Sequence, residues 1–294
     1  MGKNVFKRLD TDSDLFQEAL TFTTNKTGFN PALIEKDYFC SLILSYLFSI
    51  ESSLIFKGGT ALNKVHVGFY RLSEDLDFSI SMPHSSTRSQ RSKRIDPFRN
   101  LFSRLPKALP GIQTASPLTG RNNSLQYIGE IQYTSYVSAE PGTIQIEIGL
   151  REPNLCPVEI QSANTLLMDP VSGGSITNTI PVRVYARKEA YAEKLRAALS
   201  RRDPAIRDFF DIYHAVQKSV IELTNSELIE LTHKKLAVPG NDFLGLTPQR
   251  IEMLKTQVET ELRPVLRDEA YRDFDFEKCL SWVKALEKTL RSYK

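Results

Sequence analysis

Two short stretches, close together in the chain, constrain this protein most. Residues 57–62 read KGGTAL, and residues 71–80 read RLSEDLDFSI. A glycine pair that opens a helix presents backbone N–H groups to a phosphate. Two aspartates one residue apart on a strand, Asp75 and Asp77, direct both carboxylates to the same face. The pattern therefore predicts both halves of a site for a divalent metal ion and a nucleotide.

The composition is that of an ordinary globular protein. The chain has 294 residues, of which 41% are hydrophobic and 25% charged, which excludes a disordered or fibrous protein. Its longest apolar run, residues 38–50, is too short to cross a bilayer. The amino terminus has no secretory pattern, and the three cysteines lack the spacing of a zinc site or a disulfide framework. We therefore expect a cytoplasmic protein.

Hydrophobic spacing and turn residues predict a strand, turn, helix, strand unit around the two motifs. Its strands are expected at 54–57 and 76–80, with a helix at 60–67 between them. Two helices, at 14–24 and 31–50, precede this unit. A loop over 83–94 and a helix over 97–105, ended by Pro106, are expected to follow it.

Further strands are expected at 126–138, 144–150 and 182–185. In residues 144–150 the isoleucines alternate with polar residues, so Glu147 is predicted to point away from the apolar layer. A segment rich in Ser, Gly and Thr, 172–179, reads as a linker, and the pattern after 185 is helical. The sequence thus predicts an α+β protein with a domain at 1–171 and a mainly helical domain at 180–294.

The spacing of Asp75 and Asp77 suggests what they bind. Two carboxylates so close repel each other unless a cation lies between them, and Mg²⁺ favours a few carboxylates together with substrate phosphate oxygens. If the strand of Glu147 lies beside that of Asp77, a third acid completes a two-metal site. The alternative is a surface turn whose acids cap helices.

The residues around the glycine pair suggest a phosphate site. Gly58 and Gly59 let the backbone approach a phosphate, and Thr60 begins a helix whose amino end carries partial positive charge. Ser73 can donate a hydrogen bond to the phosphate, although a local turn bond is the alternative. A glycine pair alone marks a tight turn, and the nearby Asp-x-Asp strand makes the nucleotide reading more specific.

A second cluster lies far along the chain. Lys194 can reach a phosphate as a compact cation. Asp208 and Asp211 share one helical face, close enough to orient Lys194 or to bind base and sugar. The alternative is a structural network of ion pairs, and His214 reads as structural rather than catalytic.

The segment 85–107 is strongly basic. Against one acid, Asp96, it carries seven basic residues: Arg88, Arg91, Lys93, Arg94, Arg99, Arg104 and Lys107. Such a segment can contact a nucleic-acid backbone or can be a solvated loop.

Several motifs in order resemble one known group. They are IEKDY at 34–38, FKGGTAL at 56–62, RLSEDLDF at 71–78, AEKL at 192–195 and RDFFD at 207–211. The chain resembles the AbiEii/AbiGii family of nucleotidyltransferase toxins, which includes the MenT toxins, within the DNA polymerase β-like superfamily.

The resemblance implies a polymerase β-like nucleotidyltransferase domain, with a mixed sheet flanked by helices, and a helical carboxy-terminal domain. It implies a nucleoside triphosphate held in a cleft between them, with phosphates on Gly58, Gly59 and Ser73 and Mg²⁺ (or Mn²⁺) on Asp75 and Asp77. Lys194, Asp208 and Asp211 would complete the site. Relatives are toxins neutralised by an antitoxin, and some extend the 3′ end of tRNA.

We therefore expect a Mg²⁺-dependent nucleotidyltransferase that is the toxin of a toxin–antitoxin pair and acts on RNA, with tRNA as the expected acceptor. The catalytic residues are expected to be Asp75, Asp77, Lys194 and Asp211. One alternative keeps the chemistry with a small-molecule or protein hydroxyl as the acceptor. Another is a catalytically silent module that binds a nucleotide or the antitoxin. The sequence leaves open whether ATP, GTP, CTP or UTP is used.

Overall fold

The computed structural model describes residues 6, 8–50 and 53–293. The first residues of the amino terminus, which shows no secretory pattern, lie outside the described part. By packing, the chain forms two compact units, Met1–Tyr185 and Ala186–Lys294, which are described in turn. The domain limits at 171 and 180 stay predictions from the sequence.

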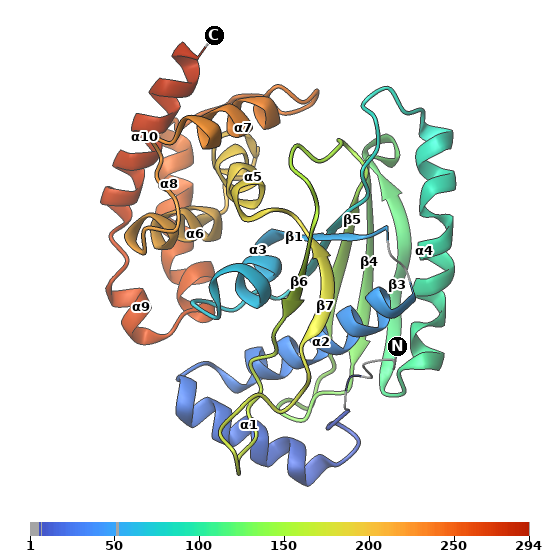
Figure 1. The fold of residues 1–294 in the computed structure, drawn as a ribbon. Helices are drawn as coiled ribbons and strands as arrows, with labels where there is room; N and C mark the ends of the chain where they lie inside the picture. The colour runs from blue at the N-terminus through green and yellow to red at the C-terminus, as the bar shows by residue number, and fades with distance from the viewer. Residues whose placement is uncertain (1–5, 7, 51–52, 294) are drawn as a thin grey trace. The chain divides into compact units, whose positions relative to one another are not determined.

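The first unit is built on one seven-stranded sheet with the order β3-β4-β5-β2-β1-β7-β6. Its strands are β1 (Ile55–Lys57), β2 (Leu76–Ser79), β3 (Ile112–Arg121), β4 (Gln126–Tyr133), β5 (Gly142–Gly149), β6 (Glu159–Ala163) and β7 (Ile180–Val184). The pairs β1–β7 and β2–β5 are parallel and the other neighbouring pairs are antiparallel (Figure 1). The predicted mixed sheet is confirmed.

Helices pack on this sheet because one side of each is apolar. In chain order they are α1 (Ser13–Thr27), α2 (Pro31–Ile50), the short α3 (Gly58–Ala61), the π-helix η1 (Leu62–Val67), α4 (Arg88–Ala108) and the 3₁₀ turn η2 (Asn122–Ser124). Helix α2 packs on β5 and β7, and α4 packs on β3. Phe48 of α2 contacts Phe78 of β2, so this face of the sheet forms the core of the unit.

The helix predicted over 97–105 is present but longer, and the loop predicted over 83–94 ends at Thr87. A single helix, α4, begins at Arg88 and runs through Pro97 and Pro106, so Pro106 does not end it. It begins at a capping box, in which the side chains of Thr87 and Gln90 each bond the other's backbone N–H. Pro97 is exposed, so water can satisfy the carbonyl that loses its helical partner.

The strands β3 and β6 were not predicted. Both lie at the edges of the sheet, where side chains are less buried and an alternating apolar pattern is least required. Strand β3 also contains Pro117, which an edge strand tolerates because one side of its backbone needs no partner.

A buried ion pair joins α2 to the helix that follows the glycine pair. Lys64 Nζ lies 2.6 Å from Asp37 Oδ1, and both side chains are almost fully buried. The same ammonium donates to Ser41 Oγ at 2.7 Å. The other carboxylate oxygen of Asp37 accepts the backbone N–H of Leu166 at 3.0 Å. Three segments distant in sequence are therefore fixed around one charge pair, and with them the helix behind Gly58.

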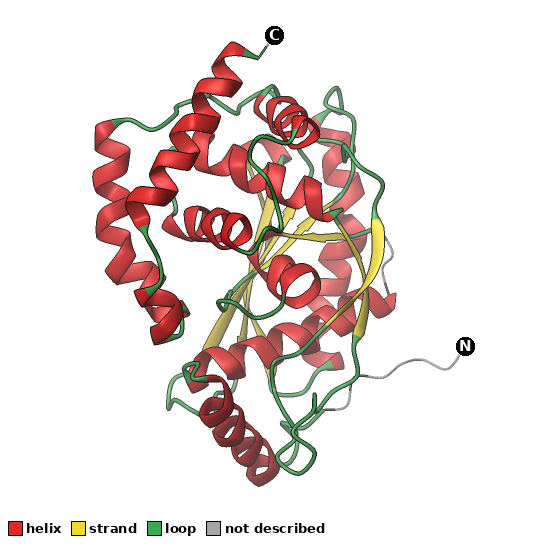
Figure 2. Ribbon diagram, turned by 60° about the vertical axis from the view of Figure 1, so that its left-hand side comes forward, coloured by secondary structure: helices red, strands yellow, loops and turns green. Residues whose placement is uncertain are grey.

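The second unit is mainly helical, as predicted, and its described residues, 186–293, form helices and loops without a strand (Figure 2). It comprises α5 (Arg187–Ser200), α6 (Ile206–Gln217), α7 (Ser226–Leu236), α8 (Pro248–Gln257), η3 (Val258–Leu262), η4 (Arg263–Val265), α9 (Asp268–Arg272) and α10 (Phe276–Ser292). Across the described part of both units, no helix combines the length and the apolar character needed to span a membrane.

Replacing Lys64 with Met should destabilise the first unit strongly. The change leaves the carboxylate of Asp37 buried without its cation, which typically costs roughly 3–5 kcal/mol of unfolding free energy. The matched control is Lys36→Met on α2, the helix of Asp37, since Lys36 Nζ lies 3.5 Å from Glu74 Oε1 and both side chains are partly exposed. Urea unfolding measures both, and equal losses would contradict a structural role for the Asp37–Lys64 pair.

Candidate active site

Strand β2 positions the two aspartates. Asp75 directly precedes the strand and Asp77 lies within it, while the intervening Leu76 is fully buried in the core. Both aspartates are partly buried, and the alternation of an extended chain predicts that they share one face. The hydroxyl of Thr60 donates to the carbonyl oxygen of Asp75, so the start of the helix is tied to the start of the strand.

The glycine pair lies against these groups. Gly58 has φ +77°, and a Cβ placed on it would lie 2.2 Å from Asp77 Oδ2. A Cβ on Gly59 would lie 3.1 Å from Ser73 Oγ and 2.4 Å from a guanidinium nitrogen of Arg71. Only glycine allows this approach. The structure thus brings Gly58, Gly59, Ser73 and Asp77 together at one turn.

Arg71 was not singled out from the sequence. It is 2% exposed, and its guanidinium donates to the carbonyl oxygen of Leu72 at 2.9 Å. A buried arginine beside the glycine turn sets positive charge next to the position predicted for phosphate. The signal was present, since Arg71 begins the RLSEDLDF motif.

The sheet register aligns a third acid and a lysine with Asp77. Asp77 is paired with Lys57 of β1 on one side and with Glu147 of β5 on the other. Directly paired residues project from the same face, so the condition for Glu147 is met: its strand lies beside that of Asp77. Lys57 was also not singled out from the sequence. Its Nζ lies 3.8 Å from the position that a Cβ on Gly149 would take, which places the ammonium over this same face.

The acids do not form a preformed metal cage. In the described part of the chain, no three His, Cys, Asp or Glu side chains are close enough to hold a metal ion together. Glu147 therefore shares the face and register of Asp77 without closing a three-carboxylate cluster. Mg²⁺ commonly takes one or two carboxylates plus substrate phosphate oxygens, and the Asp75–Asp77 pair fits that donor set.

In the second unit, Lys194 joins the two predicted aspartates. Its Nζ lies 2.8 Å from Asp208 Oδ1 and 2.8 Å from Asp211 Oδ2. Arg201 lies 3.3 Å from the other oxygen of Asp208. Burial raises the pKa of Asp208, but the charges of Arg201 and Lys194 outweigh this and hold its pKa below the ordinary value. Asp208 is therefore ionised at neutral pH.

His214 follows this cluster on α6. Burial, with the charge of Lys218 nearby, lowers the pKa of His214 to about 4. The imidazole is therefore neutral at physiological pH in the folded protein. Because the unfolded chain takes up this proton first as the pH falls below about 6.5, acidification through that range favours unfolding.

Alanine at Gly58 should cost more stability than alanine at Gly28. Both glycines have a similar positive φ, +77° and +73°, so both substitutions carry a backbone penalty of roughly 1–2 kcal/mol. A Cβ at Gly28 meets no atom within 4 Å, whereas at Gly58 it collides with Asp77. Urea unfolding of the two variants isolates the collision, and equal free-energy losses would contradict the close approach of Gly58 and Asp77.

Comparison with known proteins agrees with this geometry. Residues 44–281 match the family model described as nucleotidyl transferase AbiEii toxin, Type IV TA system. No curated protein matches the sequence.

Two solved structures share the fold. MenT4, a nucleotidyltransferase toxin from Mycobacterium tuberculosis, superposes with a TM-score of 0.60 at 18% identity, over 95% of this chain and 90% of its own. JHP933 from Helicobacter pylori superposes with a TM-score of 0.53 at 17% identity, over 89% of this chain and 93% of its own.

The family model covers most of the chain, and the glycine turn and the Asp-x-Asp strand both lie inside the matched range. The chain belongs to the AbiEii family of nucleotidyltransferase toxins of type IV toxin–antitoxin systems.

Proposed function

We propose that this nucleotidyltransferase moves a nucleoside monophosphate from a nucleoside triphosphate to a hydroxyl of RNA, with the 3′ end of tRNA as the expected acceptor. The observation that carries the proposal is the turn at Gly58 and Gly59, whose backbone approaches Asp77, Ser73 and Arg71. Such a turn can bind triphosphate oxygens beside a pair of carboxylates.

Each residue of the turn has a role in this proposal. The backbone N–H groups of Gly58 and Gly59 and the hydroxyl of Ser73 bind phosphate oxygens. The hydroxyl of Thr60 donates to the carbonyl oxygen of Asp75 and so holds Asp75 in place. Asp75 and Asp77 hold Mg²⁺, with Mn²⁺ as the other candidate, and Glu147 is the candidate third acid on the same face. When bound, the metal supplies positive charge that stabilises phosphate oxygens and lowers the pKa of a coordinated hydroxyl.

The reaction is an in-line displacement at the α-phosphorus. The acceptor oxygen forms a bond to that phosphorus, its proton leaves, and the bond to the bridging oxygen of pyrophosphate breaks. The protein's part is to orient the triphosphate and to neutralise charge on the departing pyrophosphate. The buried guanidinium of Arg71 beside Gly59 serves this neutralisation.

Lys194, Asp208 and Asp211 are included as residues that serve the bound nucleotide. A lysine held between two carboxylates is fixed in position, which suits a phosphate contact. The same contacts also suit a structural role, so variants must separate folding from catalysis.

The acceptor is proposed to be RNA because of the charge on α4. Its basic residues form part of an ordered helix, and the sequence around them is nearly free of acids. The family pairs its toxins with antitoxins, so a cognate antitoxin is a partner of the chain.

The test is to incubate the purified protein with each α-labelled triphosphate, Mg²⁺ and cell RNA. We expect label that ribonuclease removes, and we expect Asp75→Asn to lower its incorporation by roughly 100-fold or more, because a carboxylate that holds the metal is lost. Glu74→Gln, the neighbouring acid, is the matched control and should keep activity.

Label sensitive to protease alone would contradict the RNA acceptor. Binding of a triphosphate without any transfer would favour a silent module. Equal activity of Asp75→Asn and wild type would contradict the assignment of Asp75 as a metal ligand.

Lys194 should be tested in a background that keeps the second unit folded. Lys194→Met alone leaves buried carboxylates without their shared cation, which typically costs roughly 3–5 kcal/mol. In Lys194→Met/Asp211→Asn only Asp208 remains charged, and Arg201 still pairs with it. We expect this double variant to recover much of the stability and to stay inactive in label transfer. A folded double variant with wild-type kcat and KM for the triphosphate would contradict a role in catalysis.

A further inference from the structure

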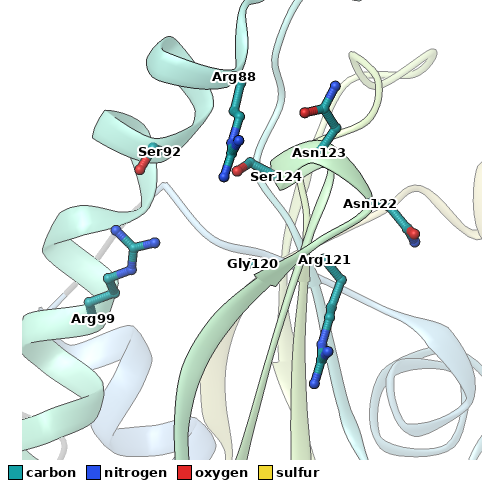
Figure 3. Close-up of a pocket in the computed structure, with 8 residues that line it drawn as sticks. All are labelled: Arg88, Ser92, Arg99, Gly120, Arg121, Asn122, Asn123 and Ser124. Atoms are coloured by element: carbon teal, nitrogen blue, oxygen red, sulfur yellow. The ribbon is translucent and has the colours of Figure 1, made fainter.

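A polar pocket lies between the first half of α4 and the far end of β3. Its volume is about 310 Å³, and it is lined by Arg88, Ser92, Arg99, Gly120, Arg121, Asn122, Asn123 and Ser124. Figure 3 shows Arg88 and Arg99 extending from α4 toward Ser124, while Arg121 projects on the other side of the strand end. The walls hold arginine, serine, asparagine and glycine and no apolar side chain. Such walls suit a phosphate rather than a base or an apolar ligand.

The charges of this pocket are available to a ligand. Among the described residues, Arg88 and Arg121 form no ion pair, and both are exposed. Arg99 pairs with Asp96, with 2.7 Å between Nη1 and Oδ1, but both side chains are well exposed, so that pair is weak. Arg99 also lies over the ring of Tyr127, with its guanidinium 5.0 Å from the ring centre, which fixes its direction.

The pocket is built by buried contacts. Arg91, 7% exposed, donates to the carbonyl oxygen of Asn123 at 3.1 Å and also to that of Ser86. It thereby clamps the turn at 122–124 to the start of α4. Beneath Gly120 lies Tyr127, which is fully buried, and its hydroxyl has no hydrogen-bond partner among the described residues. A buried polar atom without a partner beside such a pocket is a second mark of a binding site.

The sheet register places only the rim of this pocket, Arg121, on the active-site face. Arg88 and Arg99 come from α4, which packs on the opposite face, the face of Gly120 and Tyr127. Glu147 is paired with Ile128, and Ile128 with Thr119, so these residues share the face of Asp77. Arg121 lies two residues beyond Thr119 on the same strand and therefore projects from that face too. Strand β3 is three strands away from β2, which is roughly 14 Å. About four stacked nucleotides cover the distance across this face from the strand of Arg121 to that of Asp77.

We propose that the pocket of Arg88, Ser92, Arg99 and Ser124, with Arg121 at its rim, binds backbone phosphates of the acceptor RNA a few nucleotides from the reacting end. The inference rests on the proposed function and adds a site remote from the chemistry. Binding there is independent of base identity, because the contacts are to phosphate alone. Its effect is to hold the RNA strand at the open edge of the sheet, where Arg121 leads from the pocket to the face that carries Asp77.

The test is equilibrium binding of a fluorescein-labelled single-stranded RNA of twelve nucleotides, at several salt concentrations and without triphosphate. Arg88→Gln/Arg121→Gln removes two exposed charges that line the pocket. Lys93→Gln/Arg94→Gln removes two exposed charges of the same helix that do not line it. We expect about a tenfold weaker affinity and a log–log salt slope shallower by about 0.7 per lost phosphate contact in the pocket variant. The control should change little.

Label transfer separates this inference from the proposed function. We expect the pocket variant to show a raised KM for RNA with an unchanged KM for the triphosphate. If wild type labels RNA and the pocket variant has an unchanged KM for RNA, the pocket assignment is overturned while the function stands. If both double variants weaken binding equally, α4 acts only as a general basic surface and the pocket is also overturned.

Two further outcomes would overturn the pocket assignment. If wild type neither binds nor labels RNA, the proposed acceptor fails first and takes this inference with it. If polyglutamate binds through Arg88 and Arg121 in place of RNA, the pocket is a docking site for an acidic protein.

Discussion

The close approach of Gly58 to the carboxylate of Asp77 is the constraint on which the site depends. No residue with a side chain fits between the turn and the strand, because a Cβ would overlap the carboxylate oxygen. This contact sets the backbone N–H groups of the turn directly beside the acids of β2. The proposed binding of phosphate and metal at one place requires these two elements to touch.

Buried charge pairs hold the elements that make this contact. Asp37 and Lys64 fix the helix behind the turn to α2 and to the segment at 166, and Thr60 bonds the first residue of the Asp-x-Asp motif. In the second unit, Lys194 unites α5 with α6 in the same manner. Removing either partner leaves the other charge buried and unpaired, which destabilises the fold. Motif residues such as Asp37 therefore have a structural role.

Much of the first unit could be predicted from the sequence, because its central strands carry regular apolar patterns. The helix at 31–50, the strand at 76–80 and the outward direction of Glu147 follow from residue periodicity. The edge strand β3 and the full length of α4 could not be predicted, since Pro117, Pro97 and Pro106 argue locally against them. Burial of Ile95, Phe98 and Phe102 outweighs those local signals, and burial is known only from tertiary structure.

The site was predictable in type but not in its full membership. Spacing along the chain alone suggests a metal and phosphate site at Asp75, Asp77, Gly58 and Gly59. Sequence spacing gives no such indication for three further residues, which join the site or the pocket only through strand pairing and contacts between distant segments: Lys57, Arg71 and Arg121. Glu147 lies between these cases, because its face could be predicted whereas its pairing with Asp77 required the sheet order.

In the function proposed for this protein, metal and nucleotide meet at Asp77 beside the glycine turn. Calorimetric titration of a non-hydrolysable triphosphate into wild type and Asp77→Asn, each with and without Mg²⁺, measures the coupling between metal and carboxylate directly. We expect Mg²⁺ to tighten binding to wild type and this gain to disappear in Asp77→Asn. The same Mg²⁺-dependent gain in both proteins would show that Asp77 does not hold the metal.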